Sequence, residues 1–405
     1  MTDHDRLTDT LRGRAASLGD QHPLSLDDVK GRATGIRRRR RVVSGLAAAA
    51  VLAVAVPAGI AVSDRTASTT RPDSGPVATA DGTPDPRPVV PADPVPLDVD
   101  TAARSGEAGI PVLYDGLAHL PEGGTFELPG DYTDMVRTAD GWAGVVGGID
   151  GTGRLDLLDE SGDVLDTAEA TRGLAVSPDG TVLAYVTPDG EVVVVTGGEA
   201  EVLGALPEGQ FTPAGVVGCA DGGCTVFTNT ESGPASLVTA DGVEPAYDFL
   251  EVTGVTADGR VAGVISVEDD PTKEPGSCSA VVDDAGEQLW ETCEFTLGRF
   301  SPDGEMVLGH PAYQSGEGDG SLAVLDADDG TVLAEYVNNA ESQAFLYTSA
   351  WDADGTVLGL VRQGMSWHLM RFTADGQLSH ATSGGEGEWE YVDGADAPLR
   401  FVPGP

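Results

Sequence analysis

Carboxylates are the side chains of this sequence that could carry general acid–base chemistry. The 405 residues contain 66 Asp and Glu against 23 Lys and Arg, which gives a net charge of −43. A glycosidase needs two such carboxylates on either side of a glycosidic bond. Most of the Asp residues here stand in short turns, where the side chain caps its own backbone. We therefore assign no catalytic residue, and we keep a hydrolase that acts on cell-wall glycan as the alternative function.

The histidines give little further support to catalysis. Outside the first 41 residues they are His119, His310, His368 and His380. None lies in a G-x-S-x-G or H-E-x-x-H frame, the patterns of serine hydrolases and zinc proteases. We expect them at surface or turn positions. We also expect a protein that has no cofactor or metal and is not an enzyme.

Calcium binding is the other chemistry that the acidic residues suggest. Residues 326–330 (DADDG) resemble a shortened EF-type loop. Such a loop has Gly sixth and a bidentate Glu twelfth, whereas here Gly330 is fifth and Val337 is twelfth. The pattern favours a tight hairpin turn, and weak cation binding by the acidic surface is the alternative.

The four cysteines predict two disulfides. They form two pairs, each symmetric about a short turn: Cys219 with Cys224, and Cys278 with Cys293. Cysteines opposite one another in a hairpin reach disulfide geometry at non-hydrogen-bonded positions. A zinc site would need a C-x-x-C knuckle, which the sequence lacks. Both disulfides imply folding in an oxidising compartment.

The elements that would position these residues repeat along the chain. Two short hydrophobic runs separated by Asp-Gly recur every 37 to 51 residues. Asp-Gly between apolar runs predicts a β-hairpin, because Gly takes φ > 0 and Asp caps the turn. A hairpin at this period is typical of a β-propeller. The turns are Asp140-Gly141, Asp179-Gly180, Asp221-Gly222, Asp258-Gly259, Asp303-Gly304, Asp354-Gly355 and, more weakly, Asp393-Gly394.

The repeat predicts an all-β fold, a seven-bladed β-propeller over residues 110–405. Six blades are complete in the sequence. Residues 111–128 and 388–402 each give one further hairpin. Joined, these hairpins form a seventh blade that closes the ring and removes free sheet edges. A six-bladed ring with spare strands is the alternative.

The residues before the propeller predict a membrane anchor. Residues 1–41 end in five consecutive Arg, and residues 42–62 form an uncharged apolar run. As a helix this run is about 32 Å long, enough to cross a hydrocarbon core. The positive-inside rule then places residues 1–41 in the cytoplasm and the remainder outside. Residues 63–109, rich in Pro, Thr and Ala, predict a disordered linker. A cleaved signal peptide is the alternative.

Two of the repeats carry a family resemblance. Residues 177–184 (SPDGTVLA) and 301–308 (SPDGEMVL) resemble the SPDG hairpin of TolB-like and WD40-like propellers. The whole chain is similar to membrane-anchored propeller proteins of high-GC actinobacteria. This resemblance implies the fold and specifies no activity. It departs from true WD40 repeats, because Trp351-Asp352 opens a turn instead of ending a strand.

The loops opposite the Asp-Gly turns are the predicted ligand-binding face. They are longer and more varied than the turns, and loops on a rigid scaffold commonly carry binding residues. The candidates are Asp269, Asp270 and Lys273 in one loop, Tyr313 and Gln314 in the next, Asn338, Asn339 and Gln343 in a connection, and Arg362 and Trp367 around a hairpin.

Together these features predict a single-pass plasma-membrane protein. Its extracytoplasmic propeller would bind a protein, peptide or envelope ligand, either simply as a binding module or as a sensor. Residues 1–41 are then a docking segment for a cytoplasmic partner or a topogenic tail. Nucleic acid is disfavoured as a partner, because residues 42–405 hold 13 basic and 60 acidic residues, a net of −47 that repels phosphates.

Overall fold

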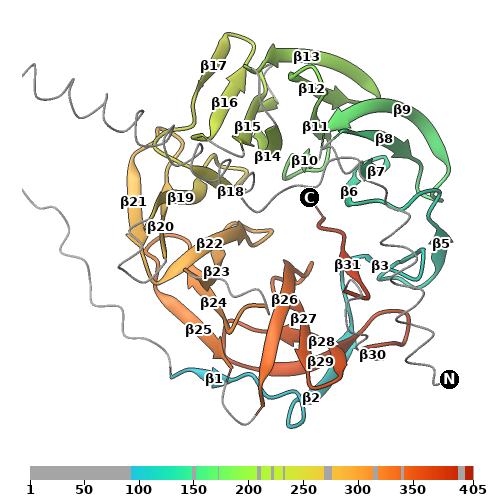
Figure 1. Cartoon of the computed structure of the whole chain (residues 1–405), viewed down its shortest axis with the longest axis vertical. Coiled ribbons are helices and arrows are strands. Elements are labelled where there is room, and N and C mark those ends of the chain that lie inside the picture. Colours follow the sequence, from blue (N-terminus) through green and yellow to red (C-terminus); the bar gives the residue numbers. More distant parts are fainter. Residues whose placement is uncertain are drawn as a thin grey trace, which may run out of the picture. The chain divides into compact units, whose positions relative to one another are not determined.

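Seven sheets, each with an antiparallel core, stand around a common centre in the computed structural model of the chain (Figure 1). Each sheet has a core of four strands, and two sheets carry additional outer strands. The predicted all-β, seven-bladed propeller is therefore confirmed, and the six-bladed alternative is wrong.

The structure describes residues 93–147, 152–171, 173–207, 211–219, 223–230, 233–268, 276–312, 318–338, 342–390 and 397–404. All of them belong to one compact unit, Pro84–Pro405. The predicted tail (1–41), the predicted membrane helix (42–62) and residues 63–92 of the predicted linker lie outside the described residues. Within those that are described, no helix is both long enough and apolar enough to cross a membrane.

The first four blades each come from one continuous stretch of chain, with the innermost strand first. Blade 1 contains β6 (Asp134–Thr138), β7 (Gly141–Gly147), β8 (Thr152–Leu158) and β9 (Val164–Thr171). Blade 2 contains β10 (Ala175–Val176), β11 (Val182–Val186), β12 (Glu191–Thr196) and β13 (Glu199–Ala205). Blade 3 contains β14 (Phe211–Val217), β15 (Thr225–Thr230), β16 (Ser236–Thr239) and β17 (Gly242–Pro245). Blade 4 contains β18 (Glu251–Val255), β19 (Val261–Val267), β20 (Ser277–Val282) and β21 (Gln288–Thr292).

Blades 5 and 6 follow the same order. Blade 5 contains β22 (Phe295–Phe300), β23 (Met306–Pro311), β24 (Ser321–Asp326) and β25 (Val332–Val337). Blade 6 contains β26 (Ala344–Trp351), β27 (Val357–Gln363), β28 (Ser366–Phe372) and β29 (Leu378–Thr382). Second strands such as β11 are buried at every residue, because each blade packs between two neighbours. Fourth strands such as β13 are largely exposed.

Side chains at the start of the Asp-Gly turns fix the first hairpin of several blades. In blade 2, Ser177 Oγ donates a hydrogen bond to Asp179 Oδ1 (2.5 Å) and accepts one from Val182 N (2.9 Å). Ser301 is bonded in the same way in blade 5. Gly180 follows at φ 75°, which a residue with a Cβ rarely adopts. The SPDG sequence therefore specifies the turn through local bonds.

The seventh blade closes the ring with strands from both ends of the propeller segment. The prediction that each end supplies a two-stranded hairpin is wrong, because the N-terminal side supplies three strands and the C-terminal side one. Its order is β31 (Arg400–Phe401), β3 (Val112–Tyr114), β4 (Leu117–His119) and β5 (Thr125–Glu127). The C-terminal residues thus give only the innermost strand, not a hairpin. The other expected strand, β30 (Glu388–Glu390), pairs with β28 and extends the outer ladder of blade 6.

Residues 93–109 belong to the propeller, so the predicted linker boundary at residue 109 is wrong. β1 (Val95–Pro96) pairs in parallel with β25, and β2 (Ala103–Glu107) pairs in parallel with β29. Leu97 and Val99, between these strands, are each 1% exposed and pack in the core between blades 5 and 6. The prolines that favoured a disordered linker are equally compatible with an outermost strand, where one edge needs no ladder bonds.

Both predicted disulfides are present. Cys219 is bonded to Cys224 and Cys278 to Cys293, with Cα atoms 4.2 and 4.0 Å apart. The first lies in the hairpin of β14 and β15, and the second joins β20 to the end of β21. Because each disulfide stays within one blade, neither ties the ring together.

Candidate ligand-binding channel

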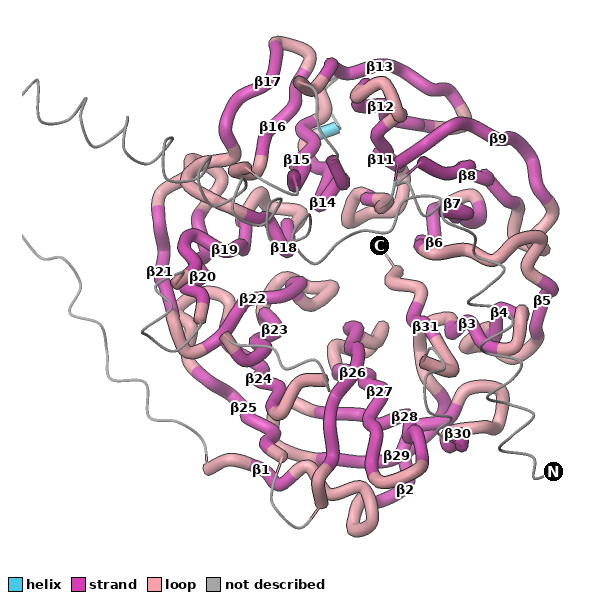
Figure 2. The backbone as a smooth tube through the Cα atoms, viewed as in Figure 1, coloured by secondary structure: helices cyan, strands magenta, loops and turns pink. Residues whose placement is uncertain are grey.

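The innermost strands of the blades surround a cavity of 1220 Å³. Figure 2 shows these strands, β6, β10, β14, β18, β22, β26 and β31, around the centre of the ring. Residues of all seven blades line the cavity. Asp258 and Asp303 lie at the end formed by the Asp-Gly turns. The inner-strand glycines Gly215 and Gly254 let neighbouring blades pack closely, because a Cβ there would lie 2.4 Å from Val255 and 3.1 Å from Arg299. A cavity of this size can hold a small organic ligand or a peptide end.

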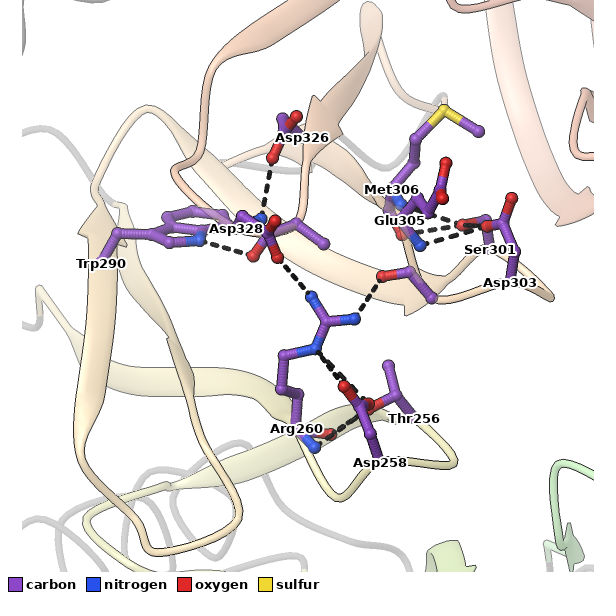
Figure 3. A network of polar contacts seen from close by, with 12 residues as sticks. Thr256, Asp258, Arg260, Trp290, Ser301, Asp303, Glu305, Met306, Asp326 and Asp328 are labelled. Carbon is purple, nitrogen blue, oxygen red and sulfur yellow. Dashed lines mark hydrogen bonds and ion pairs between the residues drawn. The ribbon is translucent and has the colours of Figure 1, made fainter.

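Arg260 closes the junction between blades 4 and 5 at the turn end of the channel (Figure 3). Its guanidinium donates to Asp328 Oδ1 (2.8 Å) and to Gly304 O (2.9 Å) of blade 5. Its Nε donates to Asp258 Oδ2 (3.2 Å) of its own turn. The Trp290 indole N–H donates to Ala327 O beside this network (2.9 Å). Arg260 thus holds two blades together, and its donors are engaged within the protein.

The carboxylates that line the channel differ in their suitability for acid catalysis. Hydrogen bonds from Thr256 and Ser301 lower the pKa of Asp258 and Asp303 respectively, so both stay ionised. Asp352 is held by an ion pair. Burial raises the pKa of Asp134, although the Arg299 charge and the Leu174 N–H partly offset this rise. Asp134 is the channel carboxylate best suited to act as a general acid.

The bonding of the channel carboxylates bears on the alternative function, a glycan hydrolase. Such an enzyme needs a second carboxylate that is free to act as base or nucleophile. Of the four that line the channel in the described chain, Asp258, Asp303 and Asp352 are each bonded to a side chain of the protein. These bonds fix three of the four carboxylates at the channel wall, and the hydrolase stays the alternative function.

A histidine–aspartate pair lies at the end of the channel opposite the turns. His310 Nδ1 is 2.9 Å from Asp319 Oδ2, and both side chains are largely buried. Two backbone hydrogen bonds between Asp319 and Leu346 hold the blade 5 loop against β26 of blade 6. A Cβ at Gly298 would lie 3.4 Å from His310 Nε2, so the glycine leaves the imidazole open toward the channel.

An exposed aromatic ring lies beside this pair. Tyr347, on β26, lines the channel and is 54% exposed. Its ring meets Trp367 edge-on with centroids 5.1 Å apart. Arg362 lies over the Phe345 ring, 5.8 Å from its centroid. A flat ring supported by a second aromatic and placed at a cavity mouth is a common ligand contact.

The structure describes four of the ten predicted ligand-binding residues. Arg362 and Trp367 form a cross-strand pair in the hairpin of β27 and β28. Trp367 is buried, so it supports Tyr347 instead of facing a ligand. Asn338 follows β25, the fourth strand of blade 5, and Gln343, at φ 47°, precedes the innermost strand of blade 6. Asp269, Asp270, Lys273, Tyr313, Gln314 and Asn339 lie outside the described residues.

Three channel residues that are placed to contact a ligand are absent from the ten predicted ligand-binding residues. His310, Asp319 and Tyr347 converge only because a loop of blade 5 pairs with the first strand of blade 6. No motif in the sequence marks these three residues. The calcium-like residues 326–330 instead form the turn between β24 and β25, with Asp328 N donating to Asp326 Oδ1 (2.8 Å). Among the described side chains, no group suited to metal binding occurs.

Two histidines are buried, contrary to the expectation of surface positions. His119 is 7% exposed and stacks on Tyr114 with ring centroids 3.7 Å apart. Neither of its ring nitrogens has a hydrogen-bond partner within the described part of the chain. Burial lowers the pKa of His119 and of His368, and nearby carboxylates such as Glu386 offset this only in part.

We expect stability to fall as the pH drops below about 6.5, the ordinary pKa of histidine in the unfolded chain. The folded state disfavours the protonated imidazoles, so the unfolded state binds more protons in this window. His119→Phe keeps the stacking and removes one of these groups. Urea unfolding of wild type and variant at pH 7.5 and 5.5 should show a smaller loss for the variant. Equal losses would contradict a contribution from His119.

Comparison with known proteins finds similarity among solved structures and no family match. Neither a scan against known protein families nor a search of curated proteins found a match. Among solved structures, the chain is similar to the β-propeller domain of Cps50 (Swd1) from Myceliophteria thermophila. The identity is 13% and the TM-score 0.45, over 68% of this chain and 90% of that one. The fold assignment here rests on the seven sheets themselves.

Proposed function

We propose that the chain is a single-pass membrane protein whose extracytoplasmic propeller binds a protein, peptide or envelope ligand at the channel mouth between blades 5 and 6. The observation that carries the proposal is the exposed Tyr347 ring on the channel wall, backed by Trp367. The His310–Asp319 pair adds a polar contact on the neighbouring blade. The extracytoplasmic location is supported by the two disulfides, which persist in oxidising compartments.

Tyr347→Ala tests the binding proposal. The full-length protein, purified in detergent and immobilised, is exposed to solubilised envelope peptides and glycans. The variant should retain at most about a fifth of the wild-type affinity, because a buried aromatic contact contributes roughly 1–3 kcal/mol. Leu165→Ala is the matched control, since Leu165 is 67% exposed on β9 and does not line the channel. Equal binding by wild type and Tyr347→Ala would refute the site.

The topology has its own test. Protease treatment of intact cells should remove the propeller and spare residues 1–41. A protected propeller would overturn the extracytoplasmic assignment. If the protein is a sensor, residues 1–41 would be the segment that docks a cytoplasmic partner, and deletion of those residues should abolish the response without changing ligand affinity.

A further inference from the structure

A β-bulge places Tyr347 on the channel wall. The ladder between β26 and β27 shifts its register between Leu346 and Thr348, so Tyr347 is an extra residue without a cross-strand partner. A bulge turns the side chain of such a residue away from its regular direction. The Tyr347 ring is 54% exposed and lines the channel. It therefore presents an aromatic surface to a ligand.

A second bulge, in blade 5, leaves His310 accessible from the channel. The ladder between β22 and β23 shifts its register between Leu297 and Phe300, and Gly298 lies in this shift. His310 belongs to β23, the second strand of the blade, yet it lines the channel. A Cβ at Gly298 would lie 3.4 Å from His310 Nε2, so the absence of a side chain there keeps this nitrogen open.

The aromatic ring and the imidazole belong to adjoining parts of the channel wall. Asp319 Oδ2 lies 2.9 Å from His310 Nδ1. Asp319 N donates to Leu346 O (2.7 Å), and Leu346 N donates to Asp319 O (3.0 Å). Because Tyr347 directly follows Leu346, these bonds join the strand that carries the ring to the loop that holds the imidazole.

The bond to Asp319 determines what His310 can contribute to a ligand. An ionised carboxylate only accepts hydrogen bonds, so the neutral imidazole donates through Nδ1. Nε2 is then an acceptor, and a ligand at this position has to donate an O–H or N–H. The His310 and Asp319 side chains are 20% and 14% exposed, so little water competes for the pair.

Charge favours a neutral donor over an ionic one. Arg299, the residue after Gly298, is exposed and lines the channel, so its positive charge repels an ammonium group at Nε2. The Asp319 carboxylate lies behind the imidazole, in a propeller of strongly negative charge, and repels an anion. A neutral ligand with hydroxyl groups meets neither repulsion.

We propose that Tyr347 and His310 bind a sugar ring of a neutral glycan. A pyranose ring stacks its C–H groups on an aromatic face and carries hydroxyl groups at its rim. One such hydroxyl donates to His310 Nε2 while the ring lies against Tyr347. This inference rests on the proposed function and specifies the class of its ligand.

The probes are three neutral trisaccharides: triacetylchitotriose, mannotriose and galactotriose. Each is titrated by calorimetry into the full-length protein, purified in a detergent without a sugar head group, and at least one should bind saturably. Deacetylated chitotriose, which carries ammonium groups, and trigalacturonate, which carries carboxylates, should both bind about tenfold more weakly or less than that neutral trisaccharide. An ionic trisaccharide that binds as tightly as every neutral one would overturn the neutral-glycan assignment.

Gly298→Ala tests the His310 contact and leaves the His310–Asp319 bond in place. Its methyl group would lie 3.4 Å from Nε2, in the space that the sugar hydroxyl needs. The loss of one neutral hydrogen bond should weaken binding of the trisaccharide about fivefold. Tyr347→Ala should weaken it about fivefold or more, because the stacked aromatic surface is lost.

Gly106→Ala is the matched control, since Gly106 is exposed on β2 and does not line the channel. A Cβ there would meet nothing within 4 Å, so the affinity should stay unchanged. Equal affinities of wild type and Gly298→Ala, or no saturable binding by the neutral trisaccharides, would overturn the sugar site. If the trisaccharides fail to bind while Tyr347-dependent capture of an envelope protein or peptide persists, this inference fails and the proposed function stands. If Tyr347→Ala changes neither, both fail.

Discussion

Replacing Arg371 with Met is expected to lower the free energy of unfolding by about 3–5 kcal/mol, because it leaves a buried carboxylate without its partner. Arg371 Nη2 donates to Asp352 Oδ2 at 2.6 Å and to Glu107 O at 2.9 Å. The Asp352 side chain is 1% exposed and that of Arg371 is 13% exposed. Gly109 packs directly on this carboxylate, where a Cβ would lie 2.5 Å from Oδ1. Water therefore has little access to replace the lost guanidinium.

Two further variants separate the charge effect from general disruption. Arg104→Met changes an exposed arginine on β2 and should cost less than about 0.5 kcal/mol. The double variant Arg371→Met with Asp352→Asn removes the unpaired charge, so it should recover much of the loss seen for Arg371→Met alone. Urea unfolding of the three proteins provides the comparison. A loss under about 1 kcal/mol for Arg371→Met would contradict the role of this ion pair.

The blade repeat is predictable from sequence because each signal is local. An Asp-Gly turn and its capping side chain lie within a few residues, as the Ser177 and Asp179 bonds show. The cysteine pairs are equally local, because each spans one hairpin. Such features need no knowledge of distant parts of the chain.

Ring closure is less predictable, because it joins strands from opposite ends of the sequence. β31 has only two residues, too few to show the alternation that marks a strand. Its partner β3 lies almost 290 residues earlier, with Leu113 opposite Arg400. β1 and β2 are difficult to predict for the same reason, since they lie in the predicted linker, whose Pro-rich composition predicts disorder, and only tertiary pairing with blades 5 and 6 orders them.

The channel residues depend on contacts between blades and so escape sequence patterns. His310 and Asp319 flank a loop whose path across to Leu346 no motif encodes. Arg137, Arg299 and Arg400 are separated by more than 100 residues from one another, and they line one cavity only because the ring closes. The predicted ligand-binding residues stay a prediction, and the choice of channel side chains required the packed structure.

Deleting residues 397–405 should have the largest effect of any change considered, the loss of cooperative folding. The deletion removes β31 and with it Leu399 and Val402, which are 1% and 0% exposed. Leu399 packs in the core shared by blades 6 and 7, and Val402 in the core shared by blades 7 and 1. Burial of each side chain contributes about 1.5–3 kcal/mol before the resulting cavities are counted.

The total stability of a domain is roughly 5–15 kcal/mol, so the loss of both buried side chains removes a large part of it. The deletion also frees the inner edge of β3, which becomes a site for intermolecular strand pairing. We therefore expect a broad thermal transition and aggregated protein on size-exclusion chromatography. Ring closure between the chain ends, and not covalent cross-linking, would then be what stabilises the propeller.

Variants that lack a disulfide provide the comparison for the deletion of residues 397–405, because each disulfide lies within one blade. The Cys219–Cys224 disulfide closes a short loop, so the double variant Cys219→Ser with Cys224→Ser should cost about 2 kcal/mol. The Cys278–Cys293 disulfide closes a longer loop, so the corresponding double variant should cost about 3 kcal/mol. Both variants should elute as the wild type does and unfold cooperatively at a lower temperature. A truncated protein that kept the wild-type elution and melting temperature would show that β31 is dispensable, and the ring would have to be held by the contacts between the remaining blades.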